Sequence, residues 1–224
     1  MFGAPYHLRY APPVPGQTSE VYSRYFSEFM ALVKAATKKK QKKAVILGHS
    51  YGGMVALEFV MSTARVWRDE HIERLVLVAP TLPNGFLGSV TKFVTGTGMI
   101  FVPTVTSMRP MWRSFESAMA NFPSPAVFGR EPLVVTKRRN YSAYDMEDFL
   151  AALGFGEGVE PFRRRAVPRM YSSEAPMVPM TCINAVGNKT PLQLVLWDDD
   201  DDDLLDAELA IVGQKQKPAQ ALRE

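Results

Sequence analysis

The sequence predicts an α/β fold, in which a mostly parallel sheet has helices on both faces and a long segment is inserted as a cap or lid. Two short, fully apolar runs, Ala44–Leu47 and Leu75–Ala79, are typical of strands inside a parallel sheet. Between them, apolar residues recur at helical spacing over Gly53–Arg65. A strand, a helix and a second strand in this order imply a right-handed crossover connection.

The composition is that of an ordinary globular protein. The 224 residues, 46% apolar and 22% charged, are enough for one domain with a large core. The net charge of +3 is too small to indicate a nucleic-acid partner, and much of the positive charge lies in two local runs, Lys38–Lys43 and Arg163–Arg165. The single cysteine, Cys182, excludes an intramolecular disulfide.

Neither a signal peptide nor a transmembrane segment is expected. Met1 is followed by a turn-like Gly-Ala-Pro, and no run reaches the roughly 18 apolar residues of a membrane-spanning helix. We therefore expect a soluble or peripheral protein. The compartment does not follow from the sequence.

The amino-terminal segment is expected to contain a strand end and then a helix. Residues Met1–Tyr10 have the pattern of a strand's exit end, and a proline-rich loop follows. Thr18 or Ser19 can cap a helix whose apolar positions form one broad face. The lysine run Lys38–Lys43 suits its carboxyl end, where the helix dipole favours positive charge.

The stretch AVILGHSYGG, residues 44–53, predicts a strand that turns sharply into a helix with Ser50 at the apex. Gly48 and Gly52 flank this serine at positions where side chains would collide with the adjoining strand and helix. This is the pattern of a nucleophile elbow, which holds its serine in an unusual backbone conformation and points neighbouring N–H groups at a developing oxyanion. The alternative is a Gly-Ser turn without chemistry.

The segment Thr81–Pro179 has patchy helical pattern and is interpreted as the cap or lid. It is rich in methionine and aromatic residues, which could line a cleft for lipid because thioethers adapt to varied shapes. The alternative is an ordinary small core under long loops. The residues concerned are Phe93, Met99, Phe101, Met108, Met111, Trp112, Phe115, Phe122 and Phe128.

After the cap, Met180–Gly187 has strand pattern and is expected to rejoin the main sheet, with Leu192–Trp197 as a further strand. Six aspartates and a polar tail follow, for which we expect disorder. The predicted division is therefore a core over 1–80, a cap over 81–179, a return to the core sheet over 180–197, and an acidic run and tail over 198–224.

Several short segments of the sequence resemble plant proteins similar to lecithin–cholesterol acyltransferase. They are GAPYHLRY, AVILGHSYGG, PSPAVFG followed by PLVVT, NYSAYDMEDF and TCINAVGNKTP, in order over roughly residues 2–192. NYSAYDMEDF and PLVVT have no generic structural reason to occur together, so the resemblance is specific. It implies an α/β-hydrolase fold with a lid and no cofactor. The implied substrates are acyl esters of glycerophospholipids or sterols, whose acyl group passes to a serine and then to an alcohol or water.

The resemblance also assigns roles to individual residues. Ser50 occupies the nucleophile position, and the backbone N–H of Tyr51 supplies one oxyanion-hole donor. The catalytic acid lies beyond the strand at 181–186, which makes Asp198 or Asp199 the candidate in this chain. The family's base is a histidine near the end of the chain, and this sequence has no histidine after His71.

The three histidines of this sequence are poor substitutes for that base. His49 adjoins the nucleophile on the turn and cannot easily reach its hydroxyl. His71 precedes the second strand, at the wrong end of the sheet for catalysis. His7 lies near a strand exit and is the geometric contender, but it stands where the family usually has an aspartate.

The resemblance further implies that the first three strands of the fold are missing, as in a truncated gene product or an incomplete gene model. Losing them exposes a strand edge, and exposed edges promote association. Three readings of function follow. The first is a lipid acyltransferase or phospholipase, with a lipid substrate and a membrane surface as its partners. The second is a catalytically impaired relative or fragment that binds lipid, or binds a full-length partner through the exposed sheet edge. The third is a decayed sequence that does not fold stably.

Overall fold

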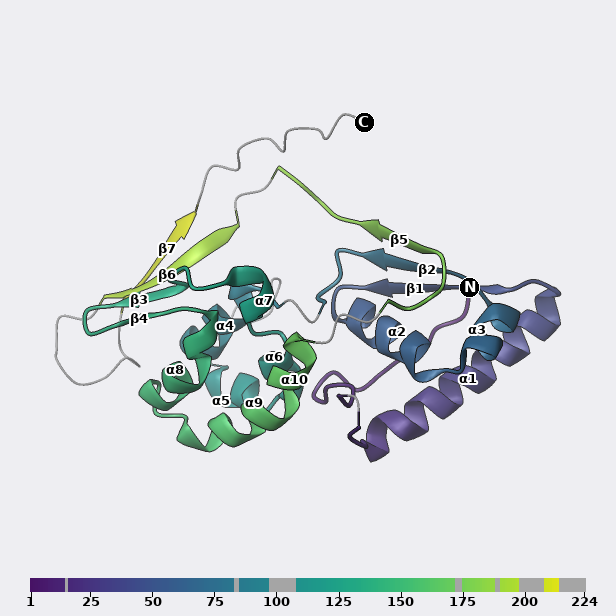
Figure 1. The fold of residues 1–224 in the computed structure, drawn as a ribbon, viewed down its shortest axis with the longest axis horizontal. Coiled ribbons are helices and arrows are strands. Elements are labelled where there is room, and N and C mark those ends of the chain that lie inside the picture. The colour runs from purple at the N-terminus through teal and green to yellow at the C-terminus, as the bar shows by residue number, and fades with distance from the viewer. Residues whose placement is uncertain are drawn as a thin grey trace.

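The computed structural model describes residues 1–14, 16–82, 85–96, 108–171, 175–187, 190–197 and 208–213. These residues form two lobes side by side (Figure 1). The predicted acid candidates, Asp198 and Asp199, lie outside the described residues, as do Met99 and Phe101. No helix among the described residues is long and apolar enough to cross a membrane.

The first lobe contains a three-stranded parallel sheet in the order β1-β2-β5. Val76 of the central strand pairs with Leu47 on one side and with Thr181 on the other. The predicted parallel sheet and the return of the chain to it are therefore present. The elements of this lobe are α1 (Glu20–Lys40), β1 (Ala44–His49), α2 (Tyr51–Ser62), α3 (Arg65–His71), β2 (Ile72–Val78) and β5 (Met180–Ile183).

Local sequence explains the ends of helix α1. Ser19, one of the two predicted caps, has extended backbone and accepts a hydrogen bond from the Tyr22 N–H at 3.4 Å. Lys38, Lys39 and Lys40 occupy the last turn, where they stabilise the negative end of the helix dipole. Gln41 then stops the helix with a left-handed φ of 51°.

The prediction of a strand end over Met1–Tyr10 is wrong, because this segment has no strand neighbour and forms a strap instead. Tyrosine hydroxyls hold the strap by its carbonyl groups. Tyr25 donates to the carbonyl oxygen of Ala4 at 2.9 Å, and Tyr51 donates to that of Tyr10 at 3.1 Å. The strap therefore lies against α1 and the start of α2.

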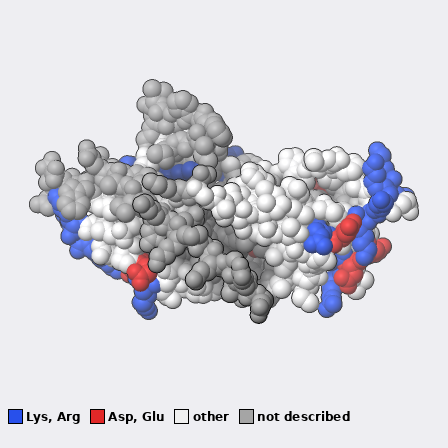
Figure 2. Space-filling model, turned by 90° about the horizontal axis from the view of Figure 1, so that it is seen from above, with Lys and Arg blue, Asp and Glu red and all other residues white. Residues whose placement is uncertain are grey.

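The helices of the first lobe cover one face of its sheet (Figure 1), whereas the sequence predicts helices on both faces. Ile46, Leu75 and Leu77 point toward these helices and are buried with Phe59 of α2. On the other face, Val45 and Leu47 are 52% and 62% exposed. Figure 2 looks down on the top of Figure 1 and shows the described part of this lobe largely uncharged, with charged side chains gathered at its far end.

The second lobe contains a four-stranded mixed sheet in the order β4-β3-β6-β7, with short helices packed against it. Its strands are β3 (Val134–Thr136), β4 (Asn140–Tyr141), β6 (Pro191–Trp197) and β7 (Glu208–Gly213). Its helices are α4 (Leu87–Thr95), α5 (Arg109–Arg113), α6 (Glu116–Ala120), α7 (Pro125–Phe128), η1 (Ala143–Asp145), α8 (Met146–Ala152), η2 (Gly156–Gly158), α9 (Val159–Arg165) and α10 (Val167–Met170).

The placement of β6 differs from the sequence analysis, which assigns Leu192–Trp197 to the main sheet. In the structure β6 runs parallel to β3, with Leu194 beside Val134. Leu194 and Leu196 alternate with more exposed neighbours and are buried in the core of the second lobe. The alternation makes this segment a strand, but the core that receives it decides which sheet it joins.

Most of the aromatic residues of the predicted cap form a core of their own. Phe93 and Phe122 are fully buried and make an edge-to-face pair with centroids 5.2 Å apart. Phe149 packs on Tyr141 in the same cluster. The ordinary-core alternative therefore describes these rings. Trp112 is the exception, since it also lines the cavity beside Ser50 described below.

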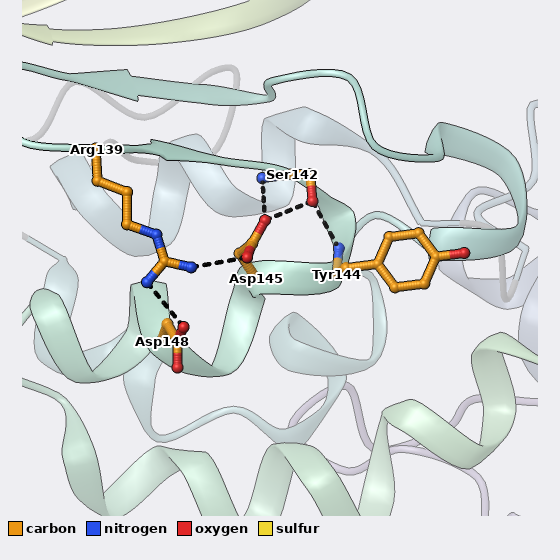
Figure 3. Close-up of polar contacts among 5 residues, drawn as sticks. All are labelled: Arg139, Ser142, Tyr144, Asp145 and Asp148. Atoms are coloured by element: carbon orange, nitrogen blue, oxygen red, sulfur yellow. Dashed lines mark hydrogen bonds and ion pairs between the residues drawn. The ribbon is translucent and has the colours of Figure 1, made fainter.

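The two segments PLVVT and NYSAYDMEDF, which carry part of the family resemblance, pair with each other in the structure. Val134 of the first segment faces Tyr141 of the second across the β3–β4 ladder. Ser142 and Asp145 then form a capping box, in which Asp145 accepts hydrogen bonds from the Ser142 N–H and hydroxyl (Figure 3). Arg139 bridges Asp145 and Asp148 at 2.8 and 2.9 Å.

A buried ion pair joins the two lobes. Arg169 of α10 is 1% exposed and donates to the carboxylate of Glu58 on α2 and to the carbonyl oxygen of Pro12. Burial raises the pKa of Glu58 above its usual range, and the nearby Arg169 guanidinium opposes that rise. Arg169 thus ties the second lobe both to the helix that follows Ser50 and, at Pro12, to the segment that follows the amino-terminal strap.

Candidate functional site

Ser50 lies at the turn between β1 and α2 with φ 52° and ψ −128°, which confirms the predicted unusual backbone. This conformation is the mirror image of extended backbone and strains any residue with a side chain. Backbone hydrogen bonds fix it from both sides. The Ser50 N–H donates to the carbonyl oxygen of Val78 at 3.0 Å, and the Ser50 carbonyl accepts from Gly53 at 2.9 Å and Thr81 at 3.1 Å.

Two of the glycines near Ser50 are required by close approach of other atoms. A Cβ on Gly48 would stand 2.5 Å from the carbonyl oxygen of Gly52, and one on Gly53 would stand 2.6 Å from the Cβ of Pro80. The predicted steric role of Gly52 is not observed. A Cβ there would make an ordinary 3.5 Å contact with the ring of Tyr6. The tight approach that the pattern predicts after the serine therefore falls at Gly53.

The first residue of α2 is Tyr51, so its N–H is one of the orphan donors at a helix amino terminus. Such a donor next to the serine suits the oxyanion-hole role assigned by resemblance. The Tyr51 side chain points away into the protein and is 6% exposed. Burial raises its pKa well above the usual range. The phenol therefore anchors the strap through Tyr10 and does not supply a proton acceptor at neutral pH.

A cavity of about 340 Å³ opens beside Ser50 and is lined by both lobes. Its walls are mainly apolar and include Leu8 of the strap and Phe86 and Trp112 of the second lobe. Ser89, Ser117, Ala118, Asn121, Lys92, Tyr51 and Thr81 complete the lining. Lys92 is the one charged side chain among these described lining residues, and its ammonium lies 5.1 Å from the centroid of the Trp112 ring.

No hydrogen bond between the described residues joins a histidine ring to Ser50. His7 is exposed, and its Nε2 lies 3.2 Å from the Arg9 guanidinium. His49 is exposed on the strand side of the turn. His71 precedes β2 at the opposite end of the sheet, where it packs edge-to-face on Trp67 with centroids 4.8 Å apart. Ser50 and Tyr51 adjoin each other at the turn, and none of the three histidine rings, all within the described part of the chain, is hydrogen-bonded to either residue.

No group of three or more His, Cys, Asp or Glu side chains able to hold a metal ion occurs among the described residues. Lys92 and the polar lining residues Ser89 and Asn121 were not anticipated from the sequence. The apolar spacing of α4 could have placed Lys92 on its partly exposed side. That spacing does not indicate that this side of α4 faces the first lobe and Ser50.

A serine in a strained strand-to-helix turn, at the carboxyl end of a parallel strand and beside an apolar cavity, defines the α/β-hydrolase class, here with an incomplete sheet. Residues 1–153 match the family model for lecithin:cholesterol acyltransferase. The match covers more than half of the chain, which therefore belongs to the lecithin:cholesterol acyltransferase family.

Individual relatives agree with this assignment. The chain is 36% identical over 193 residues to lecithin-cholesterol acyltransferase-like 1 of Oryza sativa subsp. japonica, covering 85% of this chain and 44% of that protein. It is 35% identical over 196 residues to the protein of the same name from Arabidopsis thaliana, with 85% and 45% covered. Phosphatidylcholine-sterol acyltransferase of Mus musculus is 25% identical over 231 residues, with 95% and 50% covered. The chain thus spans less than half the length of its plant relatives.

Proposed function

We propose that Ser50 is the nucleophile of an O-acyltransferase or phospholipase acting on glycerophospholipids or sterol esters. The Ser50 Oγ attacks the acyl carbonyl carbon, and the Tyr51 N–H stabilises the oxyanion that forms. Collapse of this intermediate releases the first alcohol and leaves the acyl group on Ser50. A second alcohol or water then takes the acyl group and restores the serine. The observation that carries the proposal is the strained Ser50 backbone beside the cavity.

The lining of the cavity supports a lipid substrate. Leu8, Phe86 and Trp112 offer apolar contacts for an acyl chain next to the Ser50 hydroxyl. The family also supports it, since the mouse relative is named for phosphatidylcholine and sterol. We propose that residues 81–179 act as the cap, because they contribute most of this wall.

The proton acceptor is the part of the machinery that the described residues do not supply. By resemblance, we propose Asp198 or Asp199 as the acid partner of a base that this sequence lacks. A serine hydroxyl without a base is a weak nucleophile. We therefore expect 1–224 to react slowly, by orders of magnitude compared with an intact triad.

A serine-directed fluorophosphonate tests the proposal. We expect it to label purified 1–224 at Ser50, slowly, and to leave Ser50→Ala unlabelled. Imidazole added to the solution should accelerate labelling, because it can enter the cavity and accept the serine proton. Ser62→Ala is the matched control, since that hydroxyl caps the end of α2 and should not affect labelling. Labelling that persists in Ser50→Ala would refute the assignment.

We further propose that the mouth of the cavity docks on a lipid surface. Leu8 and Phe86 both line the cavity and are 36% and 38% exposed, so they form an apolar rim around the entrance. Vesicle sedimentation should show that Leu8→Asp together with Phe86→Asp weakens binding. Val66→Asp is the control, because Val66 is 79% exposed on α3 and lies outside the cavity lining. Equal loss with the control would contradict the proposal.

The edge of β1 supports a further proposal, association with a second copy of this chain. β1 is an edge strand of its sheet, and edge strands present unpaired backbone groups to another strand. A groove of about 670 Å³ runs beside it, lined by Phe29, Val45 and Leu47. Light scattering should show a concentration-dependent dimer that Leu47→Lys dissociates and Val66→Lys does not. A monomer at all concentrations would exclude this partner.

A further inference from the structure

We propose that the groove beside β1 binds a single acyl chain that ends in an anionic head group, either a carboxylate or a phosphate. This inference goes beyond the role proposed for Ser50 and does not depend on it, because Ser50 does not line the groove. The volume of the groove is about 670 Å³. Pockets for small ligands typically have volumes of about 300–1,000 Å³, so the groove has the size of a ligand site.

The walls of the groove are mainly apolar and open to solvent. One face of α1 forms one side, and β1 with the start of α2 forms the other. The amino-terminal strap adds Phe2, which is 48% exposed, next to the exposed Val45 and Leu47 of β1. Water solvates such a surface poorly, and a ligand that covers it with hydrocarbon gains that free energy.

The groove is long enough for one acyl chain. Its lining residues on α1 extend from Tyr25 to Lys40, which is roughly 22 Å of helix at about 1.5 Å per residue. Its lining residues on β1 extend from Ala44 to His49, the whole length of the strand. Because two acyl chains end to end span the bilayer core of about 30 Å, one chain needs about 15 Å. A chain along β1 therefore leaves room for a head group.

The lysines of the groove are gathered at one of its ends. Lys40 is the last residue of α1, and Lys42 and Lys43 immediately precede β1. None of the described residues that line the groove is acidic, and no ion pair within the described chain joins these lysines to a carboxylate. Their charges outweigh the roughly half negative charge at the carboxyl end of α1. An anionic head group is therefore attracted to this end.

Binding of small amphiphiles tests both parts of the inference. Isothermal titration calorimetry on the full chain compares decanoate, decyl phosphate, decanol and hexanoate, all below their micellar concentrations. We expect each ten-carbon anion to bind about tenfold or more tighter than decanol, because its hydrogen bonds to lysine are charge-assisted. Hexanoate should bind about tenfold or more weaker than decanoate, since it buries less hydrocarbon. Of the two ten-carbon anions, the tighter one identifies a fatty acid or a phosphate-bearing amphiphile as the source of the ligand.

Equal affinity for decanoate and decanol would overturn the anionic head group, and equal affinity for decanoate and hexanoate would overturn the acyl groove. The lysines are tested together, because each of the three is exposed. A variant that combines Lys40→Met, Lys42→Met and Lys43→Met should reduce the advantage of decanoate over decanol to about twofold or less.

The matched control combines Lys34→Met, Lys38→Met and Lys39→Met. It removes the same charge from the same part of the chain, but these three lysines do not line the groove. The advantage of decanoate over decanol should therefore persist in the control. An equal loss in both variants would show a general attraction of anions to a basic chain, and that result would overturn the site.

The apolar wall is tested by Val45→Asp, which places a negative charge beside the bound chain. It should weaken decanoate binding about tenfold or more. Val66→Asp is the control, because Val66 is exposed on α3 and does not line the groove. Decanoate binding that falls with Leu8→Asp and not with Val45→Asp would place the ligand in the Ser50 cavity and overturn the inference.

A second copy paired along β1 would cover this groove, so the ligand and the second copy compete. Light scattering should therefore show less dimer in saturating decanoate, and a dimer that persists with decanoate bound would place the ligand elsewhere. The proposals fail separately. A monomer at all concentrations excludes the second copy, whereas decanoate binding that depends on Lys40, Lys42 and Lys43 still assigns the groove. Ser50→Ala should bind decanoate as the wild type does, whether or not Ser50 is the nucleophile.

Discussion

At the scale of single residues, the glycines near Ser50 differ in whether the space around them would admit a side chain. Gly48→Ala should lower the free energy of unfolding by about 2 kcal/mol or more, because its Cβ would meet backbone atoms that cannot move aside. Gly52→Ala should be neutral or stabilising, since it meets only a tyrosine ring at 3.5 Å and gains helix propensity. Urea unfolding measures both. A cost at Gly52 equal to that at Gly48 would contradict the geometry.

The conformation of Ser50 itself gives a second expectation at this scale. A φ of 52° with a ψ of −128° is easy for glycine and strained for other residues. Ser50→Gly should therefore raise the free energy of unfolding by about 1 kcal/mol, and Ser50→Ala should not. Urea unfolding compares the two, with Ser62→Gly as the control for the general cost of a glycine. A Ser50→Gly protein no more stable than Ser50→Ala would show that the turn is relaxed.

At the scale of elements, we expect the capping box after β4 to contribute more to stability than the ion pairs that surround it. Ser142→Ala should cost about 1 kcal/mol because the helical turn loses its cap. Arg139→Met should cost less, since Arg139 is about half exposed and surface ion pairs contribute little. Chemical denaturation of the two variants tests the order. A larger loss with Arg139→Met would assign the stability to the ion pairs.

At the scale of the whole molecule, the Arg169–Glu58 pair should make the union of the lobes sensitive to pH. Since burial raises the pKa of Glu58 above 4.5, the folded state binds that proton more tightly than the unfolded state does. The contribution of Glu58 to the free energy of unfolding therefore falls as the pH rises from about 4.5 through the pKa that Glu58 has in the folded state. Unfolding free energies across pH 4–7 should show this fall in the wild type and not in Glu58→Gln.

Removing the other partner gives the complementary result. Arg169→Met leaves a buried carboxylate alone and should cost about 3–5 kcal/mol at pH 7, less at pH 4.5, where Glu58 can take up a proton. Arg165→Met is the control, since its pair with Glu116 is about half exposed on the arginine side. A loss independent of pH would mean that Arg169 acts by packing alone.

The parts of the fold that can be predicted from the sequence are those set by residues close to one another along the chain. The elbow, the Ser19 cap and the parallel strands β1, β2 and β5 follow from local patterns, and the structure contains them. The sheet that receives β6 does not follow, because alternation makes a strand but does not choose its partner. Lys92 beside Ser50 was beyond prediction for a similar reason, since two lobes must meet before the cavity exists.

The order of strands in the two sheets has a consequence for how this chain folds during synthesis and for how it tolerates truncation. The first sheet is complete only when β5 at Met180–Ile183 pairs with β2, and the second only when β6 at Pro191–Trp197 pairs with β3. During synthesis neither lobe can complete its sheet until nearly the whole chain has left the ribosome, by which time slow, distant pairings must form together. A stop codon near position 175 would therefore not yield one intact lobe. It would leave both lobes incomplete, with β2 lacking β5 and β3 lacking β6.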